Sequence, residues 1–146
     1  MSWILVVDDD LQVLEVVGEM LEIEGFGVEV ARNGREAVEQ FRRNAFDVVI
    51  TDLIMPDKEG LETIAELRAI DRDVPIVAMS GGGRIGPTDY LRTARHIGAD
   101  ATLAKPFARS ELIATVTRLL SGDSSEPIVP ANASTDRPPP VPRRRE

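Results

Sequence analysis

The chain has 146 residues, of which 42% are hydrophobic, which is enough for one well-buried core and excludes wholesale disorder. Its net charge of −8 and its 4% aromatic content disfavour nucleic-acid binding, because acidic surfaces repel phosphates and bases stack on aromatic rings. The absence of cysteine and the single histidine, His96, exclude disulfides, thiol chemistry and multi-histidine metal sites. No apolar run could span a bilayer and the N-terminus lacks the pattern of a secretory signal, so we expect a cytoplasmic protein without membrane contact.

Short apolar runs alternate with amphipathic stretches along residues 1–120. The runs predict five strands, at residues 4–7, 28–30, 48–50, 76–79 and 101–104. The stretches between and after them predict five helices. In the second helix, Ala37, Val38, Phe41 and Ala45 share one apolar face. In the last helix, the apolar face is formed by Leu112, Ile113, Val116, Leu119 and Leu120, whereas Arg109, Glu111, Thr115 and Arg118 point away. This alternation predicts an α/β fold with a doubly wound parallel sheet.

The composition changes after Leu120, where prolines, serines and arginines replace the periodic apolar pattern. We therefore expect a folded domain over residues 1–121 and a disordered C-terminal tail over residues 122–146. The tail is neutral, so the whole net charge belongs to the domain. The segment from Pro138 to Arg145 is rich in proline and arginine; it either binds a partner or is simply solvated.

Polar residues follow four of the five predicted strands. Asp8, Asp9 and Asp10 follow the first, Asp52 the third, Ser80 the fourth and Lys105 the fifth. Because the carboxyl ends of parallel strands meet at one edge of a sheet, these side chains are expected to converge there. We interpret Asp10, together with Asp57 and Asp100 elsewhere in the chain, as turn or helix-capping residues.

Clustered carboxylates repel one another, so a hard divalent cation, best Mg²⁺, is the natural complement of this predicted site. With Lys105 and Ser80 nearby, the cluster predicts phosphoryl transfer in which Asp52 is the nucleophile. The alternative is that Asp8 and Asp9 only cap a helix and that Lys105 lies in an ordinary turn.

At these residues the sequence resembles the receiver domain of two-component response regulators, over about residues 2–121. The matching segments are ILVVDDD at 4–10, DVVITDLIMPD at 47–57, Gly60, PIVAMS at 75–80, GAD at 98–100 and KPF at 105–107. The resemblance implies a flavodoxin-like fold with strand order 2-1-3-4-5 and five flanking helices.

The resemblance also implies a role for each site residue. Asp52 would accept a phosphoryl group from a histidine kinase or a histidine phosphotransfer protein. Asp8, Asp9, Asp52 and the backbone carbonyl of Ile54 would hold Mg²⁺, with Asp9 in direct contact. Lys105 would contact the phosphoryl group, Ser80 would be the switch hydroxyl, and the peptide bond between Lys105 and Pro106 would be cis.

One position departs from the family pattern, because Thr102 stands where the family commonly has an aromatic switch residue. We therefore expect a switch without aromatic reorientation, in which Ser80 and the loop of Gly81, Gly82 and the following residues move. Ile54 and Gly82 offer no polar side chain to orient a hydrolytic water, which predicts a long-lived phosphoryl group.

These features predict a single-domain response regulator that phosphorylates and dephosphorylates only itself and is otherwise not an enzyme. We expect a monomer or weak dimer whose phosphorylated surface binds a downstream protein. One alternative is an unphosphorylated receiver-like scaffold or dimerisation module. Another alternative is an enzyme, either a nucleotide-binding protein or a phosphatase. Residues 81–86 match the dinucleotide motif G-x-G-x-x-G, but they follow the fourth predicted strand, whereas the motif belongs after the first. A phosphatase of this kind would need a second carboxylate at the position of Ile54.

Overall fold

The computed structural model describes residues 1–53, 60–80 and 98–122. Five strands form one parallel sheet in the order β2-β1-β3-β4-β5, as the resemblance implies. The strands are β1 (Trp3–Val7), β2 (Gly27–Ala31), β3 (Val48–Asp52), β4 (Ile76–Ser80) and β5 (Ala101–Ala104). The described helices are α1 (Leu11–Ile23), α2 (Gly34–Arg43), α3 (Gly60–Ile70) and α5 (Arg109–Leu120). The helix predicted between the fourth and fifth strands falls within residues 81–97, outside the described part.

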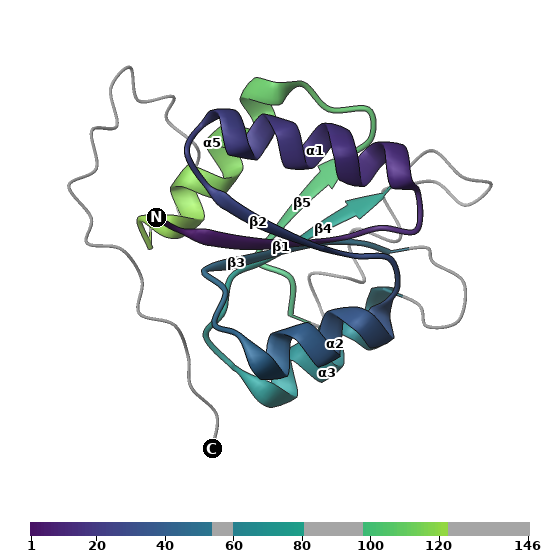
Figure 1. Ribbon diagram of the computed structural model, residues 1–146. Coiled ribbons are helices and arrows are strands. Elements are labelled where there is room, and N and C mark those ends of the chain that lie inside the picture. The colour runs from purple at the N-terminus through teal and green to yellow at the C-terminus, as the bar shows by residue number, and fades with distance from the viewer. Residues whose placement is uncertain (54–59, 81–97, 123–146) are drawn as a thin grey trace.

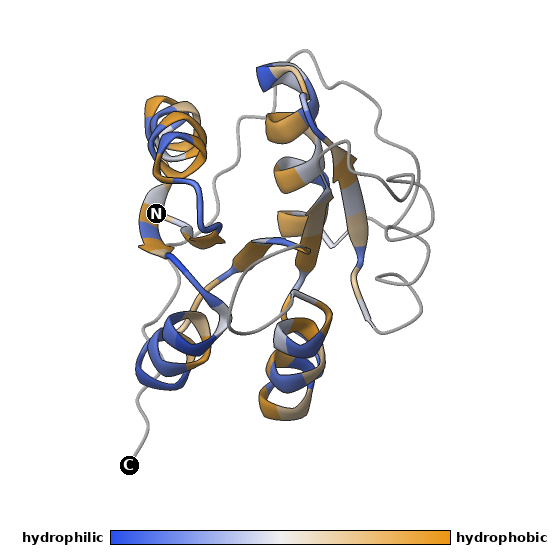
Figure 2. Cartoon of the chain, turned by 90° about the vertical axis from the view of Figure 1, so that its right-hand side faces the viewer, coloured by the Kyte–Doolittle hydropathy of each residue, from blue (hydrophilic) through white to orange (hydrophobic). Residues whose placement is uncertain are grey.

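The helices form two layers, with α1 and α5 on one face of the sheet and α2 and α3 on the other (Figure 1). The strands β1, β3 and β4 are buried on both faces, which explains why they read as continuous apolar runs instead of alternating ones, whereas the edge strands β2 and β5 are partly exposed. Figure 2 shows this difference, since the strands are mostly hydrophobic whereas the helices carry both kinds of residue. In the described part of the chain, no helix is long and apolar enough to cross a bilayer.

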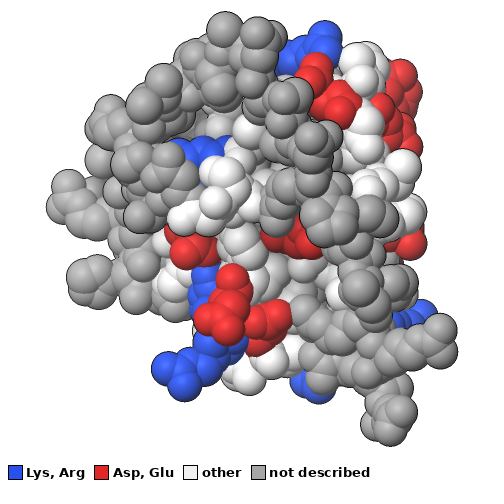
Figure 3. All heavy atoms as spheres, turned by 90° about the vertical axis from the view of Figure 1, so that its left-hand side faces the viewer, with Lys and Arg blue, Asp and Glu red and all other residues white. Residues whose placement is uncertain are grey.

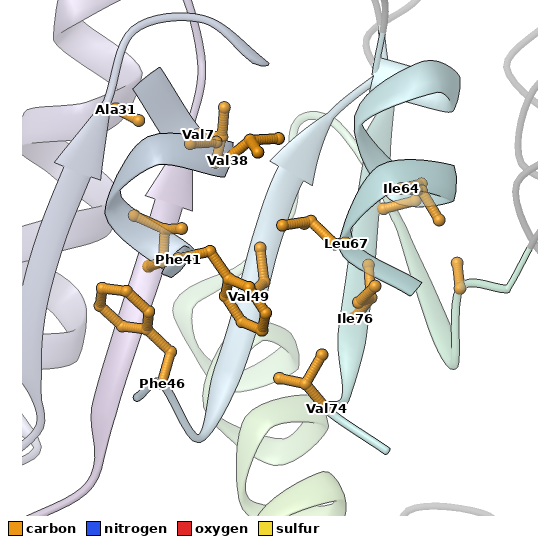
Figure 4. Packing of buried hydrophobic residues seen from close by; sticks show 14 of the residues in the cluster. Val7, Ala31, Val38, Phe41, Phe46, Val49, Ile64, Leu67, Val74 and Ile76 are labelled. Carbon is orange, nitrogen blue, oxygen red and sulfur yellow. The ribbon is translucent and has the colours of Figure 1, made fainter. Parts of the chain in front are cut away.

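Each face of the sheet carries its own hydrophobic cluster. Leu5 and Val7 of β1 belong to the cluster under α2 and α3, whereas Ile4 and Val6 belong to the cluster under α1 and α5. In the first cluster, Phe41 stacks on Phe46 with ring centroids 6.3 Å apart, beside the aliphatic side chains of β3, α3 and β4 (Figure 4). The two clusters hold the sheet between the helix layers and so fix where its strand ends lie.

Side-chain caps set where two helices begin. Asp10 caps α1, because its Oδ1 accepts a hydrogen bond from the backbone N–H of Gln12 at 2.9 Å, as the sequence predicted. Asn33 caps α2 in the same way through the N–H of Glu36, also at 2.9 Å. Both helices therefore start directly after the strand-end turns that precede them.

Two expectations about helix faces are wrong. Ala45 does not extend the apolar face of α2, because that helix ends at Arg43. Thr115 was expected to point away from the core but is buried. Its Oγ1 donates a hydrogen bond of 2.7 Å to the carbonyl of Glu111 one turn earlier, so the hydroxyl is satisfied without water.

Candidate functional site

Three carboxylates meet at the carboxyl ends of β1 and β3. Asp8 and Asp9 directly follow β1, and Asp52 is the last residue of β3, not the first residue after it. The two strands are neighbours in the sheet, and β1 pairs with β2 on its other side, so the direction of winding reverses between β1 and β3. One oxygen of each carboxylate lies within 4.8 Å of the others. The structure therefore brings together the acidic residues that the sequence singled out.

Asp8 is held by hydrogen bonds to both of its carboxylate oxygens. Its Oδ1 accepts from the backbone N–H of Asp10 at 2.9 Å, and Asp10 itself is the N-cap of α1, so the alternative that Asp8 only caps this helix is wrong. Its Oδ2 accepts from Nζ of Lys105 at 2.7 Å. Only 1% of the surface of Asp8 is exposed. This buried carboxylate therefore fixes both the turn that leads into α1 and the side chain of Lys105.

Lys105 joins the fifth strand to the acidic cluster. Its Nζ lies 2.7 Å from Oδ2 of Asp8 and 3.2 Å from Oδ1 of Asp52, which makes one ammonium group shared by two buried carboxylates. Its backbone N–H donates to the carbonyl of Ser80 at 2.8 Å, so the ends of β4 and β5 are tied together beside the cluster. The peptide bond between Lys105 and Pro106 is cis, as predicted.

Ser80 and Thr102 lie near this edge but at different depths. Ser80 is the last residue of β4 and is 1% exposed, which places the predicted switch hydroxyl inside the molecule. Thr102 lies in β5, pairs in register with Ala78 and is half-buried. The predicted site residues Ile54, Gly81 and Gly82, together with His96, lie outside the described residues.

The carboxylates of the cluster oppose one another's ionisation, whereas Lys105 favours it. Burial, followed by repulsion from Asp8, raises the pKa of Asp52 to about 6, although Lys105 acts to lower it. Partial loss of solvation, followed by repulsion from Asp8, also raises the pKa of Asp9, although this residue is largely exposed. Burial by itself would lower the pKa of Lys105, but its contacts with Asp8 and Asp52 outweigh burial and raise it. One ammonium group therefore leaves the three carboxylates short of positive charge.

This donor set fits Mg²⁺. Carboxylate oxygens are the ligands that hard divalent cations prefer, and Mg²⁺ is commonly held by one or two carboxylates while it keeps several waters. Asp9 is exposed beside the buried Asp8 and Asp52, so the cluster has one side open to solvent. A cation there would offset the excess negative charge that Lys105 leaves.

Two residues that sequence reasoning did not recognise as site residues contact the backbone of Asp52. The Oγ1 of Thr51 donates to the carbonyl of Asp52 at 3.0 Å, and Gly60 packs directly against the same carbonyl. The sequence contains a signal for Gly60, because this glycine begins the helix that follows the loop after Asp52. Such a position is typical of close backbone approach.

Comparison with known proteins gives a consistent result. A model of the response regulator receiver domain family matches residues 4–117. A transcriptional regulatory protein of Haemophilus influenzae, a CpxR homolog, is 37% identical over 126 residues, which is 86% of this chain and 53% of that protein. Among solved structures, a receiver domain protein of Clostridium thermocellum superposes with a TM-score of 0.78 at 29% identity, covering 84% of this chain and 96% of that one. The chemotaxis protein CheY4 of Vibrio cholerae superposes with a TM-score of 0.73 at 30% identity, covering 82% and 98%.

The fold, the acidic cluster and the shared lysine define a phosphorelay signalling module, and the chain belongs to the response regulator receiver domain family. The chain spans about half the length of the curated relatives that it matches. The relatives' names describe whole proteins, whereas the shared region is the receiver domain alone.

Proposed function

We propose that this protein receives a phosphoryl group on Asp52 and thereby changes its affinity for a partner protein. The donor is a histidine kinase or a histidine phosphotransfer protein. An oxygen of the Asp52 carboxylate attacks phosphorus and forms a P–O bond, while the P–N bond of the donor phosphohistidine breaks and its nitrogen keeps the electron pair. Catalysis is confined to this self-phosphorylation and the later hydrolysis of the acyl phosphate.

The observation that carries this proposal is the position of Lys105. Its ammonium group lies within hydrogen-bonding distance of Asp8 and 3.2 Å from Asp52, so it can contact a phosphoryl group attached to Asp52. Asp52 attacks in its ionised form, which its pKa of about 6 makes the main form at neutral pH. Bound Mg²⁺, held by Asp8, Asp9 and Asp52, supplies positive charge that offsets the charge of the phosphoryl oxygens.

The residues around Asp52 convert its phosphorylation into a change in affinity for the partner protein. Phosphorylation replaces one negative charge on Asp52 by roughly two and adds acceptor oxygens. Ser80 supplies a buried hydroxyl at the end of the neighbouring β4 that can donate to these oxygens. On β5, the strand beside β4, Thr102 has a smaller side chain than the aromatic residue that the family commonly has there. A downstream partner that prefers the phosphorylated arrangement then binds more tightly, by a coupling of typically about 1–3 kcal/mol.

Phosphotransfer from candidate histidine kinases tests this proposal. Each radiolabelled, autophosphorylated kinase is mixed with the wild-type chain and with the Asp52→Asn variant. We expect rapid transfer of label from one kinase to the wild type and none to the variant. Equal labelling of both chains would show that Asp52 is not the acceptor.

A further inference from the structure

The start of α3 packs flush against the end of β3, where Asp52 lies. A Cβ atom added to Gly60 would fall within the van der Waals shell of the Asp52 carbonyl oxygen. It would also lie only 2.5 Å from Cα of Leu53 and 2.9 Å from the carbonyl carbon of Asp52. All three atoms belong to backbone, which cannot swing aside as a flexible side chain can. We propose that Gly60 and Thr51 are positioning residues that fix the backbone of Asp52 and thereby aim its carboxylate at Lys105 and the metal site.

Hydrogen bonds hold this stretch of backbone from several sides. The N–H of Gly60 donates to the carbonyl of Leu53 at 3.0 Å, and the N–H of Leu53 donates to the carbonyl of Met79 in β4, also at 3.0 Å. The Oγ1 of Thr51 donates to the carbonyl of Asp52 at 3.0 Å. Thr51 and Gly60 therefore converge on the same carbonyl group, one through a hydrogen bond and the other through its lack of a side chain.

The lack of space beside Asp52 explains the glycine at position 60. Only glycine allows α3 to approach β3 this closely, because a Cβ atom at position 60 would meet backbone atoms of Asp52 and Leu53. Gly60 thus differs from glycines whose role is to end a helix.

A shift of this backbone has consequences for the chemistry of the site. Asp52 Oδ1 lies 3.2 Å from Nζ of Lys105, and the carboxylate oxygens of the acidic cluster lie within 4.8 Å of one another. Mg²⁺ demands nearly ideal octahedral geometry, so a misplaced ligand weakens binding. A nucleophile displaced by about 1 Å can lose on the order of a hundredfold in rate. This inference rests on the proposed function, because it assigns the two residues to the same phosphoacceptor.

Three variants of the full chain test the inference, namely Gly60→Ala, Thr51→Val and the control Gly27→Ala. Gly27 is the first residue of β2, at the opposite end of the sheet from the site, and an added Cβ there would meet the ring of Trp3 at 2.6 Å. The control variant should therefore lose stability without disturbing Asp52. Thr51→Val keeps the shape of the side chain but removes the hydrogen bond to the Asp52 carbonyl.

Mg²⁺ affinity is measured by calorimetry at a temperature where circular dichroism shows each variant to be folded. The rate of phosphorylation by phosphoramidate is then measured as a function of Mg²⁺ concentration. For Gly60→Ala we expect Mg²⁺ affinity to fall about tenfold or more, and the rate at saturating Mg²⁺ to fall as well. For Thr51→Val we expect a smaller loss of about two- to fivefold in the same two quantities. Gly27→Ala should stay within about twofold of the wild type in both.

Wild-type affinity and rate in both Gly60→Ala and Thr51→Val would overturn the inference and leave the proposed function intact. If Gly60→Ala does not fold, the outcome for Thr51→Val decides alone. Losses in Gly27→Ala as large as those in Gly60→Ala would also overturn it, since they would trace the effect to general destabilisation. If the wild type itself neither binds Mg²⁺ nor accepts phosphate, the proposed function is wrong and the inference falls with it.

Discussion

Asp52 lies where burial and the neighbouring Asp8 both oppose its ionisation. In the metal-free protein at neutral pH, its negative charge therefore works against folding. Under the proposed function, Mg²⁺ would bind the folded chain and offset this disadvantage by mass action. The same charge that weakens the fold is thus the one that the proposed nucleophile and metal ligand needs.

Replacing Asp52 by asparagine should stabilise the metal-free protein. At about pH 7.5 in the presence of a chelator, we expect Asp52→Asn to raise the free energy of unfolding by about 1–2 kcal/mol, because the unfavourable charge is gone. Urea denaturation measures this directly. Saturating Mg²⁺ should reverse the order, since only the wild type keeps all three carboxylates. A metal-free variant less stable than the wild type would contradict the assignment of repulsion to this site.

The effect of the same substitution should depend on pH. The pKa of Asp52 is about 6 in the folded chain and lies near the ordinary value of 3.8 when the chain is unfolded. Between these values the folded state binds more protons, so this group makes the protein less stable as the pH rises from about 4 to about 6. The stability difference between Asp52→Asn and the wild type should grow over that range and level off above about pH 7. A constant difference from pH 4.5 to pH 8 would argue against a raised pKa.

Lys105 has the opposite influence, because it is the cation that the acidic cluster shares. We expect Lys105→Met to lower the free energy of unfolding of the metal-free protein by about 2 kcal/mol, since Asp8 would remain buried without its ion pair. Saturating Mg²⁺ should restore part of the loss. The matched control is Arg43→Met, because the ion pair of Arg43 with Glu39 is long and exposed and its loss should cost less than about 0.5 kcal/mol. Equal losses in the two variants would contradict a special role of the Lys105 pair.

At the scale of elements, α3 is fastened at both of its ends. Gly60 packs its first turn against β3, and the Arg68 guanidinium in its last turn donates to the carbonyls of Gly98 and Val74 and pairs with Asp100. Asp100 also accepts from the N–H of Ile76, so the contacts of Arg68 reach the starts of both β4 and β5. These contacts lie at the end of the sheet opposite the acidic cluster.

Removal of Arg68 should therefore separate stability from site chemistry. We expect Arg68→Leu to lower the free energy of unfolding by about 2 kcal/mol or more, because several carbonyls and Asp100 lose a charged donor. Mg²⁺ affinity should stay within about twofold of the wild type. Arg72→Leu is the control, since its side chain is exposed and its loss should cost less than about 0.5 kcal/mol. A large loss of Mg²⁺ affinity in Arg68→Leu would show that the two ends of α3 are coupled.

The helices and strands could be predicted from the sequence, but the contacts between elements that are far apart in the chain could not. Apolar runs bounded by polar residues mark strands, and parallel strands bring Asp8, Asp52 and Lys105 to one edge whatever the detailed packing. By contrast, Asp100 was interpreted as a turn or capping residue, and its partner Arg68 is 32 residues away. The contact between Gly60 and Asp52 depends on how closely α3 approaches the sheet, which periodicity does not report. The roles of Ser80 and Thr102 in switching stay predictions.

At the scale of the whole molecule, the chain combines an acidic domain with a neutral, arginine-containing C-terminal segment. Figure 3 shows acidic and basic side chains together on the face where the strands begin. The described residues include the acidic cluster, the shared lysine and helices on both faces of the sheet. The division of the chain at residue 121, the binding role of its tail and the long life of the phosphoryl group remain predictions from the sequence.

We propose that Asp52 accepts a phosphoryl group in a metal-dependent site that it shares with Lys105. The most direct test is to incubate the wild-type chain with phosphoramidate, with Mg²⁺ or with a chelator, and to determine intact mass and the modified residue by mass spectrometry. We expect one added phosphate on Asp52 with Mg²⁺, little or none with the chelator, and none in Asp52→Asn. A wild-type chain that stays unmodified with Mg²⁺, or that carries the phosphate on another residue, would contradict it.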